Sequence, residues 1–186
     1  MRNGTRPTIL GAIIVGGRSS RFGSDKACAV LNGRPLLNHV LAGLRAQTDA
    51  VVVCGRDVPG WISLADRPRA DMGPLGGLAA ALLYSAQHGF DGVLTSACDT
   101  PLVPVDLAER LAGCGPAVVV GQPLFGYWPA SLSAELDDYL ALETSRAVGQ
   151  WAARTGARRV RYGGDIPNIN RVADLLALRS TCRVAA

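Results

Sequence analysis

Short apolar runs alternate along the 186-residue chain with longer segments whose apolar residues recur at helical spacing. The runs are rich in Val, Ile and Ala, and several have no polar position at all. Runs of this kind are typical of strands buried on both faces of a parallel sheet. The pattern predicts strands at 9–15, 50–54, 92–97, 116–120 and 157–162.

Helices are predicted between these strands. The clearest covers 35–46, where Leu36, Val40 and Leu44 mark one apolar face and Arg34-Pro35 suits a helix start. The remaining helical segments are 78–88, 104–111, 131–142, 145–155 and a last one from about 172. Strands that alternate with helices predict a three-layer α/β/α fold, with a mostly parallel, Rossmann-like sheet.

The chain length fits a single domain with a substantial core. We expect this domain to span residues 9–180, between an N-terminal tail (1–8) and a C-terminal tail (181–186). No apolar stretch is long enough to span a bilayer and none resembles a leader peptide, so the cytoplasm is the expected location.

The mild positive charge could indicate nucleic acid, but an anionic small-molecule substrate explains it as well. The net charge is +4 and the pI about 9.0, but the arginines are spread along the chain without a basic run. The five cysteines are odd in number and widely spaced, with no Cys-x-x-Cys pair. Neither a disulfide framework nor a structural zinc site is therefore expected.

The loop after the first strand has the chemistry of a phosphate site. Gly16 and Gly17 end the apolar run and allow a sharp turn with close backbone approach to a ligand. Arg18, Arg21 and Lys26 follow, with small serines between them, and such groups bind polyphosphates. Lys26 is the only lysine in the chain, which indicates a position that needs a compact ammonium group.

Two further segments carry candidate ligand-binding groups. The glycine-rich stretch from Gly73 to Gly77 enters the helix at 78–88, where backbone N–H groups can meet an anion or a base edge. Asp99 follows the strand at 92–97, and carboxylates at such strand ends lie at the ligand-binding edge of open α/β sheets. Either segment could also be a purely structural turn.

Four segments, in this order, resemble the signature segments of the molybdenum cofactor guanylyltransferases, a branch of the nucleotidyltransferase family. They are 16–26, the Gly-Pro-Leu-Gly-Gly of 73–77 with Asp66 before it, Cys-Asp-Thr-Pro at 98–101, and Asn-Ile-Asn at 168–170. The chain departs from the family pattern at Ile14-Val15, where Leu-Ala is usual, and at Phe22, where Met is usual. These changes keep an apolar residue. The segment at 122–128 also resembles a substrate-side segment of the family.

The resemblance implies transfer of GMP from GTP to molybdopterin, with release of pyrophosphate. It implies that Arg21 and Lys26 hold the phosphates and that Asp99 binds Mg²⁺ as the cofactor. Asn168 and Asn170 would contact the acceptor. The nucleotide-binding residues implied are Ile14, Val15, Gly16, Gly17, Lys26, Asp66, Pro74, Leu75, Gly76, Gly77 and Asp99.

The expected partners are therefore GTP and molybdopterin, with neither nucleic acid nor a membrane. A monomer or weak homo-oligomer is expected, with contact to proteins that deliver the cofactor as a further expectation.

Three alternatives stay open at this point. A related transferase could use CTP or another phosphorylated acceptor, such as a sugar phosphate. A regulatory protein could bind the nucleotide without turnover, although the presence of both Lys26 and Asp99 favours an enzyme. A nucleic-acid binder is suggested only by the pI.

Overall fold

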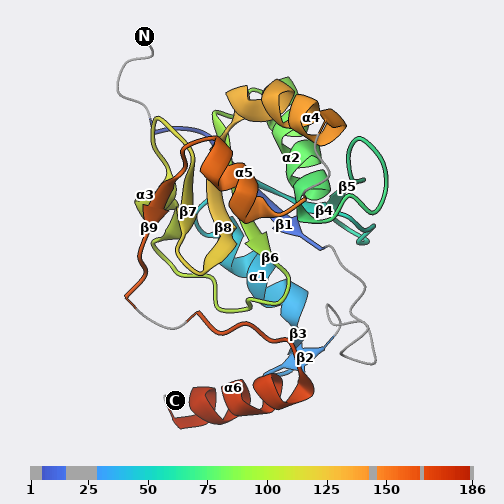
Figure 1. Cartoon of the computed structure of the whole chain (residues 1–186). Helices are drawn as coiled ribbons and strands as arrows, with labels where there is room; N and C mark the ends of the chain where they lie inside the picture. The colour runs from blue at the N-terminus through green and yellow to red at the C-terminus, as the bar shows by residue number, and fades with distance from the viewer. Residues whose placement is uncertain (1–5, 16–28, 143–145, 164–165, 185–186) are drawn as a thin grey trace.

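A computed structural model of the chain describes residues 6–15, 29–142, 146–163 and 166–184 (Figure 1). Seven strands form the central sheet in the order β5-β4-β1-β6-β8-β7-β9, and two short strands form a separate hairpin. The bounds of the strands are Ile9–Ile14 (β1), Val30–Leu31 (β2), Arg34–Pro35 (β3), Ala50–Cys54 (β4), Ile62–Leu64 (β5), Gly92–Ala97 (β6), Ala117–Val119 (β7), Gln122–Pro129 (β8) and Arg158–Val160 (β9).

Helices cover the sheet on both faces, and the last helix of the chain lies apart from it. They are Leu36–Arg45 (α1), Pro74–His88 (α2), Leu107–Leu111 (α3), Ser133–Leu142 (α4), Val148–Arg154 (α5) and Val172–Val184 (α6), with a 3-10 turn at Ala130–Leu132. Within the described residues, no helix has the length and apolar character needed to cross a membrane.

β1 is the centre of the parallel half of the sheet. All six of its residues are buried, as the run of apolar residues predicts. It pairs in parallel with β4 on one side, where Leu10 lies opposite Ala50, and with β6 on the other, where Leu10 lies opposite Val93. β5 continues this parallel arrangement beyond β4. The carboxyl ends of four neighbouring strands therefore lie at one edge of the sheet.

The other half of the sheet contains an antiparallel strand. β8 pairs antiparallel with both β6 and β7, while β9 pairs in parallel with β7. The sequence pattern does not predict β8. This strand follows β7 after only a tight turn at Gly121, which has a positive φ of 82°. The sheet is nevertheless mostly parallel, as predicted.

Two apolar cores fill the space between the sheet and its helices. On one face, α2, α4 and α5 pack around Trp128 and Trp151, both fully buried. On the other face, α1 and α3 pack against Leu94 and Phe125. Figure 1 shows α4 and α5 with α2 on one side of the sheet. The predicted three-layer α/β/α fold is confirmed.

The C-terminal helix lies apart from these layers. α6 packs on the β2–β3 hairpin and the start of α1 through a third, small core that includes Leu31, Leu36 and Leu175 (Figure 1). The Arg179 guanidinium also donates a hydrogen bond to the Val30 carbonyl oxygen. The hairpin is thereby held between the N-terminus of α1 and the C-terminal helix.

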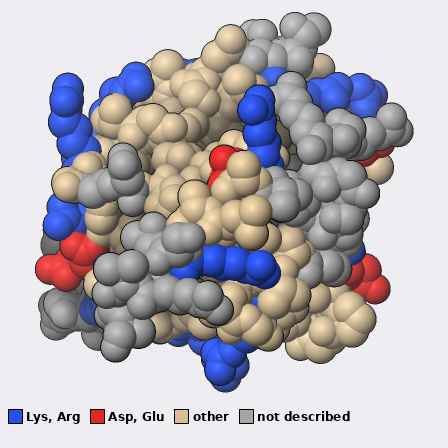
Figure 2. Space-filling model, turned by 90° about the horizontal axis from the view of Figure 1, so that it is seen from below, with Lys and Arg blue, Asp and Glu red and all other residues tan. Residues whose placement is uncertain are grey.

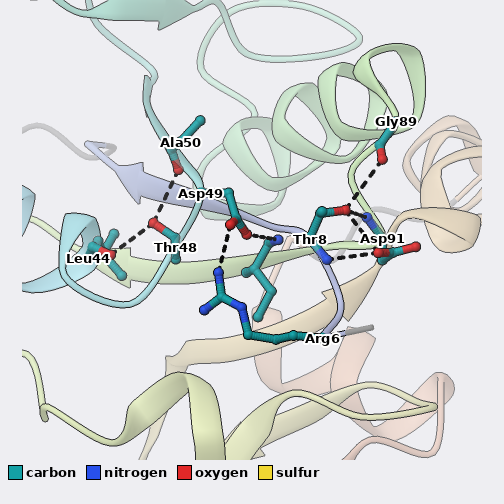
Figure 3. Close-up of polar contacts among 9 residues, drawn as sticks. Arg6, Thr8, Leu44, Thr48, Asp49, Ala50, Gly89 and Asp91 are labelled. Carbon is teal, nitrogen blue, oxygen red and sulfur yellow. Dashed lines mark hydrogen bonds and ion pairs between the residues drawn. The ribbon is translucent and has the colours of Figure 1, made fainter. Parts of the chain in front are cut away.

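The amino ends of the central strands are fixed by two carboxylates (Figure 3). Asp49 accepts hydrogen bonds from the Ile9 backbone at 2.7 Å and from the Arg6 guanidinium at 2.6 Å. Asp91 accepts from both the backbone and the hydroxyl group of Thr8, at 2.8 and 2.9 Å. Residues 6–8, at the end of the predicted tail, are therefore connected to the loops before β4 and β6.

Loss of the Asp91 hydrogen bonds should lower the stability of the protein without changing its activity. Asp91→Ala removes the acceptor of two Thr8 hydrogen bonds, so we expect the free energy of unfolding to fall by about 1–2 kcal/mol. Catalytic turnover of the folded variant should be unchanged, because the contact lies at the end of β6 opposite the carboxyl edge. Urea unfolding with Glu109→Ala, an exposed carboxylate on α3, as the control measures the difference. Equal stability of the two variants would contradict the assigned role.

Candidate functional site

The predicted site residues converge on the carboxyl ends of β4, β1 and β6. Val15 directly follows β1, and its backbone N–H donates to the Cys54 carbonyl oxygen at 2.8 Å. Asp99 lies two residues beyond the end of β6. Figure 2 shows the molecule from below, the side on which α6 lies, and an acidic side chain sits in a hollow there with basic side chains nearby.

Asp66 sits where β4, β1 and α2 meet. An added Cβ on Gly55 would lie 3.3 Å from Asp66 Oδ1 and only 2.6 Å from the Val15 carbonyl oxygen. An added Cβ on Gly76 would lie 3.1 Å from the Asp66 side chain and 2.5 Å from Met72. Glycines at 55 and 76 are therefore required for the carboxylate to approach the ends of the two strands and the start of the helix.

The glycine-rich segment forms the first turn of α2 rather than a loop before it. The helix begins at Pro74, four residues earlier than the sequence pattern predicts, and Gly73 with φ of 67° precedes it. Proline suits this first position because the N–H group it lacks has no partner inside a helix. Gly77 packs against Ile14 and Cys54, with 3.1–3.2 Å to the nearest atoms of each from an added Cβ. The segment thus brings backbone N–H groups to the strand ends.

Asp99 is held in a turn beside the C-terminal segment. The Thr100 hydroxyl donates to the Ala97 carbonyl oxygen at 2.9 Å, which fixes the turn that follows β6. The Ile169 backbone N–H donates to the Asp99 carbonyl oxygen at 2.8 Å. This bond places the predicted acceptor residues Asn168 and Asn170 next to Asp99, although they are about seventy positions apart in the sequence.

The two asparagines differ in their surroundings. The Asn168 Oδ1 atom is buried and, among the described residues, has no hydrogen-bond partner. The Asn170 side chain is exposed, and its backbone N–H donates to the Asp174 carboxylate at 2.8 Å. Asp174 also accepts from the Arg171 backbone at 2.7 Å and so fixes the start of α6. Asn168 is thus available for a ligand donor.

The remaining predicted phosphate-binding residues lie outside the described part of the chain. These are Gly16, Gly17, Arg21 and Lys26, all within 16–28. The flanking residues are described: Val15 precedes this segment, and Ala29 accepts a hydrogen bond through its carbonyl oxygen from the Leu36 backbone at 2.8 Å.

Sequence reasoning missed Gly55 as a site residue. Its φ of 92° and the 3.3 Å between an added Cβ and Asp66 Oδ1 place Gly55 beside the candidate site. A glycine directly after the buried strand β4 was the available signal, the same signal that singled out Gly16 after β1.

The donor set fits Mg²⁺ bound together with a nucleotide. Mg²⁺ prefers oxygen ligands and is commonly held by one or two carboxylates plus substrate phosphates. Among the described residues no cluster of three His, Cys, Asp or Glu side chains could form a metal cage. Asp99 would hold such a metal together with the phosphates of a bound nucleotide.

Burial determines the electrostatics near Asp66. Burial raises the pKa of the Asp66 carboxyl above its ordinary value; the hydrogen bond from the Met72 backbone lowers it, and the Asp71 carboxylate raises it further. Burial, with a smaller contribution from Asp66, also raises the pKa of the Cys54 thiol to about 12. Cys54 is therefore a neutral core residue at physiological pH, not a nucleophile.

The MobA-like NTP transferase domain family matches residues 11–161, which is most of the chain. The chain belongs to this family. A molybdenum cofactor guanylyltransferase from Rhizobium leguminosarum bv. trifolii is 36% identical over 84% of this chain and 80% of its own length. One from Cereibacter sphaeroides is 33% identical over 94% of this chain and 97% of its own. The family resemblance in the sequence is thus confirmed.

Solved structures agree with the fold. The molybdopterin-guanine dinucleotide biosynthesis protein A from Archaeoglobus fulgidus superposes with a TM-score of 0.73 at 24% identity, covering 94% of this chain and 98% of its own. A 2-C-methyl-D-erythritol 4-phosphate cytidylyltransferase from Thermus thermophilus has a TM-score of 0.67 at 19% identity, covering 92% and 98%. At these identities the likeness shows the fold alone.

Gly55→Ala tests the close approach at the strand ends. The new Cβ would have to displace the Val15 backbone or the Asp66 carboxylate. We expect the free energy of unfolding to fall by about 1–3 kcal/mol more than in the control, because the core is overpacked. We also expect nucleotide affinity to fall. Gly121→Ala is the matched control, because its φ of 82° is similarly strained but no atom lies within 4 Å of the added Cβ. Equal effects in both variants would show that φ strain alone matters.

Asp66→Asn separates binding from stability. A carboxyl whose pKa is raised by folding costs stability at every pH above that pKa, and the cost disappears as pH falls through it. At pH 7 we therefore expect a melting temperature equal to or above that of the wild type, but at least about tenfold weaker nucleotide binding. Asp57→Asn, an exposed carboxylate nearby, is the control. A lower melting temperature with unchanged nucleotide affinity would contradict this assignment.

Proposed function

We propose that this protein transfers GMP from GTP to molybdopterin, with or without bound molybdenum, and releases pyrophosphate. The relatives named molybdenum cofactor guanylyltransferase cover most of the chain at 33–36% identity, which supports this activity. The observation that carries the proposal is the position of Asp66, between β4, β1 and the first turn of α2, at the same edge as Asp99.

Guanine fits the groups at this position. Its N1–H and 2-amino group are donors that a carboxylate accepts, and its O6 is an acceptor for a backbone N–H. Asp66 would supply the carboxylate, and the first turn of α2 would supply the Leu75 backbone N–H, since Pro74 has none and the Gly76 N–H donates to the Gly73 carbonyl oxygen at 3.0 Å. Ile14, Val15 and the glycines at 76 and 77 would form the wall against which the nucleoside lies.

The transfer needs alignment and charge neutralisation rather than a covalent enzyme intermediate. A terminal phosphate oxygen of molybdopterin attacks the α-phosphorus of GTP, the bond to the β-phosphate breaks, and its electron pair leaves with pyrophosphate. Arg21 and Lys26, outside the described residues, would hold the β- and γ-phosphates, where negative charge grows. Asp99 would hold Mg²⁺, which when bound neutralises charge on the phosphate oxygens.

The acceptor would lie on the opposite side of Asp99 from the nucleoside. Asn168 and Asn170 are beside Asp99, and the buried Asn168 Oδ1 would accept a hydrogen bond from the acceptor. This atom has no hydrogen-bond partner among the described residues, which supports a ligand role, because a buried polar atom without a partner costs stability.

The cellular setting belongs to the same proposal. A cytoplasmic enzyme, monomeric or weakly oligomeric, would meet GTP directly and receive molybdopterin from the proteins that deliver it. The proposal assigns the enzyme no nucleic acid or membrane as a partner. The domain is proposed to span residues 9–180.

Competition between GTP and CTP tests the choice of base. Equal concentrations of both are supplied with Mg²⁺ and molybdopterin, and the dinucleotide products are separated. We expect a ten- to thousandfold preference for GTP in kcat/KM, equivalent to roughly 1.4–4 kcal/mol, because cytosine would leave buried polar groups unpaired.

A predominantly cytosine product would overturn the guanylyl assignment and leave nucleotidyl transfer in place. Pyrophosphate release that needs a sugar phosphate in place of molybdopterin would overturn the acceptor. Nucleotide binding without any pyrophosphate release would identify a non-catalytic binding protein.

A further inference from the structure

The loop that carries Asp66 is long and irregular. It runs from the end of β5 at Leu64 to Gly73, and two of its residues, Asp71 and Gly73, have positive φ angles of 60° and 67°. Its first half is joined to α2 by the Arg67 backbone N–H, which donates to the Gly76 carbonyl oxygen at 3.1 Å. A loop of this kind needs further contacts to hold one conformation.

One such contact reaches the outer helix layer. The Arg67 guanidinium donates to Asp137 Oδ2 on α4 at 3.2 Å, and the two side chains are 40% and 32% exposed. α4 is itself fixed by Leu136, Tyr139 and Leu140, which are buried in the core that also contains α2. Arg67, the neighbour of Asp66, is thereby connected to a rigid element that does not reach the strand ends.

The ion pair is only partly satisfied. Arg67 Nε and Asp137 Oδ1 are both buried, and neither has a hydrogen-bond partner within the described part of the chain. Loss of either charge would therefore leave the other group with less compensation in a partly buried position. The pair is consequently more than a solvated contact between two surface charges.

A second arginine holds the other half of the loop. The Arg146 guanidinium donates to the Asp71 carbonyl oxygen at 2.9 Å, and its side chain lies 3.9 Å from the position of an added Cβ on Gly73. The loop is thus fastened at Arg67 and at Asp71, both of which precede the start of α2 at Pro74.

We propose that Asp137, through Arg67, is a positioning residue that sets the place of Asp66 and so the affinity for the guanine base. This inference rests on the proposed function, since it assumes that Asp66 contacts the base. Asp137 itself touches neither substrate. Its effect is transmitted by one ion pair and by the peptide bond that joins Arg67 to Asp66.

The expected effect follows from where the pair acts. Asp137→Asn keeps the shape of the side chain and removes its charge, so the loop should sample other positions in the free protein. GTP must then select the fraction of molecules in which Asp66 is placed correctly. KM for GTP rises by the reciprocal of that fraction, and the chemical step is unchanged. We expect a three- to tenfold rise in KM for GTP, with kcat and the KM for molybdopterin within twofold of wild type.

Two further variants define the control and the rescue. Asp138→Asn removes an exposed carboxylate one position along the same helix and should leave both KM values unchanged. Asp137→Glu keeps the charge and should restore at least half of the lost affinity. The melting temperature of each variant is measured in parallel, because a merely structural role would lower stability and active fraction, and hence kcat, without raising KM for one substrate.

Each result decides a separate point. An unchanged KM for GTP in Asp137→Asn, in an enzyme that makes the guanine dinucleotide, would overturn the positioning role. A lower KM would also overturn it, because it would show that Asp137 holds Arg67 away from the nucleotide. If the wild type itself fails to prefer GTP, the proposed function fails first, which the competition assay shows independently of these variants.

Discussion

The burial of β1 on both faces and along both edges is the constraint on which the site depends. Since β1 pairs in parallel with β4 and with β6, the carboxyl ends of the three strands must lie side by side. Whatever follows each strand then meets at one edge: Val15 after β1, Gly55 after β4 and Asp99 after β6. The apolar composition of Ile9–Ile14 thus determines the location of the chemistry, although none of its residues carries a charge.

Placing the Asp66 carboxylate at the strand ends costs stability, because the position is partly buried. Asp66 lies against backbone at the strand ends, and burial raises its pKa, so its charged form is less stable there than in water. Glycines at 55 and 76 make the approach sterically allowed, and contacts from Arg67 and Arg146 hold the loop. A carboxyl whose pKa is raised by burial is a feature of many functional sites, which supports the proposed role of Asp66.

The sequence predicts the local elements well and the long-range contacts poorly. β1 and β6 follow from apolar runs, and the helical spacing predicts α1, because these signals lie within a few neighbouring residues. β8 was missed because its pairing with β6 joins segments that lie far apart in the sequence. The candidate site residues were identified by their resemblance to a protein family. The Ile169–Asp99 hydrogen bond and the Arg67–Asp137 ion pair join positions about seventy residues apart, and no local sequence pattern predicts such contacts.

Protection of backbone amides from hydrogen–deuterium exchange tests most directly whether the carboxyl edge is the nucleotide site. The exchange of the full-length protein is compared with and without a non-hydrolysable GTP analogue and Mg²⁺. The account predicts protection in peptides covering 54–56, 66–77 and 98–100, and no change at the opposite ends of the strands, around Asp49 and Asp91. Protection confined to those opposite ends, or to the edge strand β9, would contradict it.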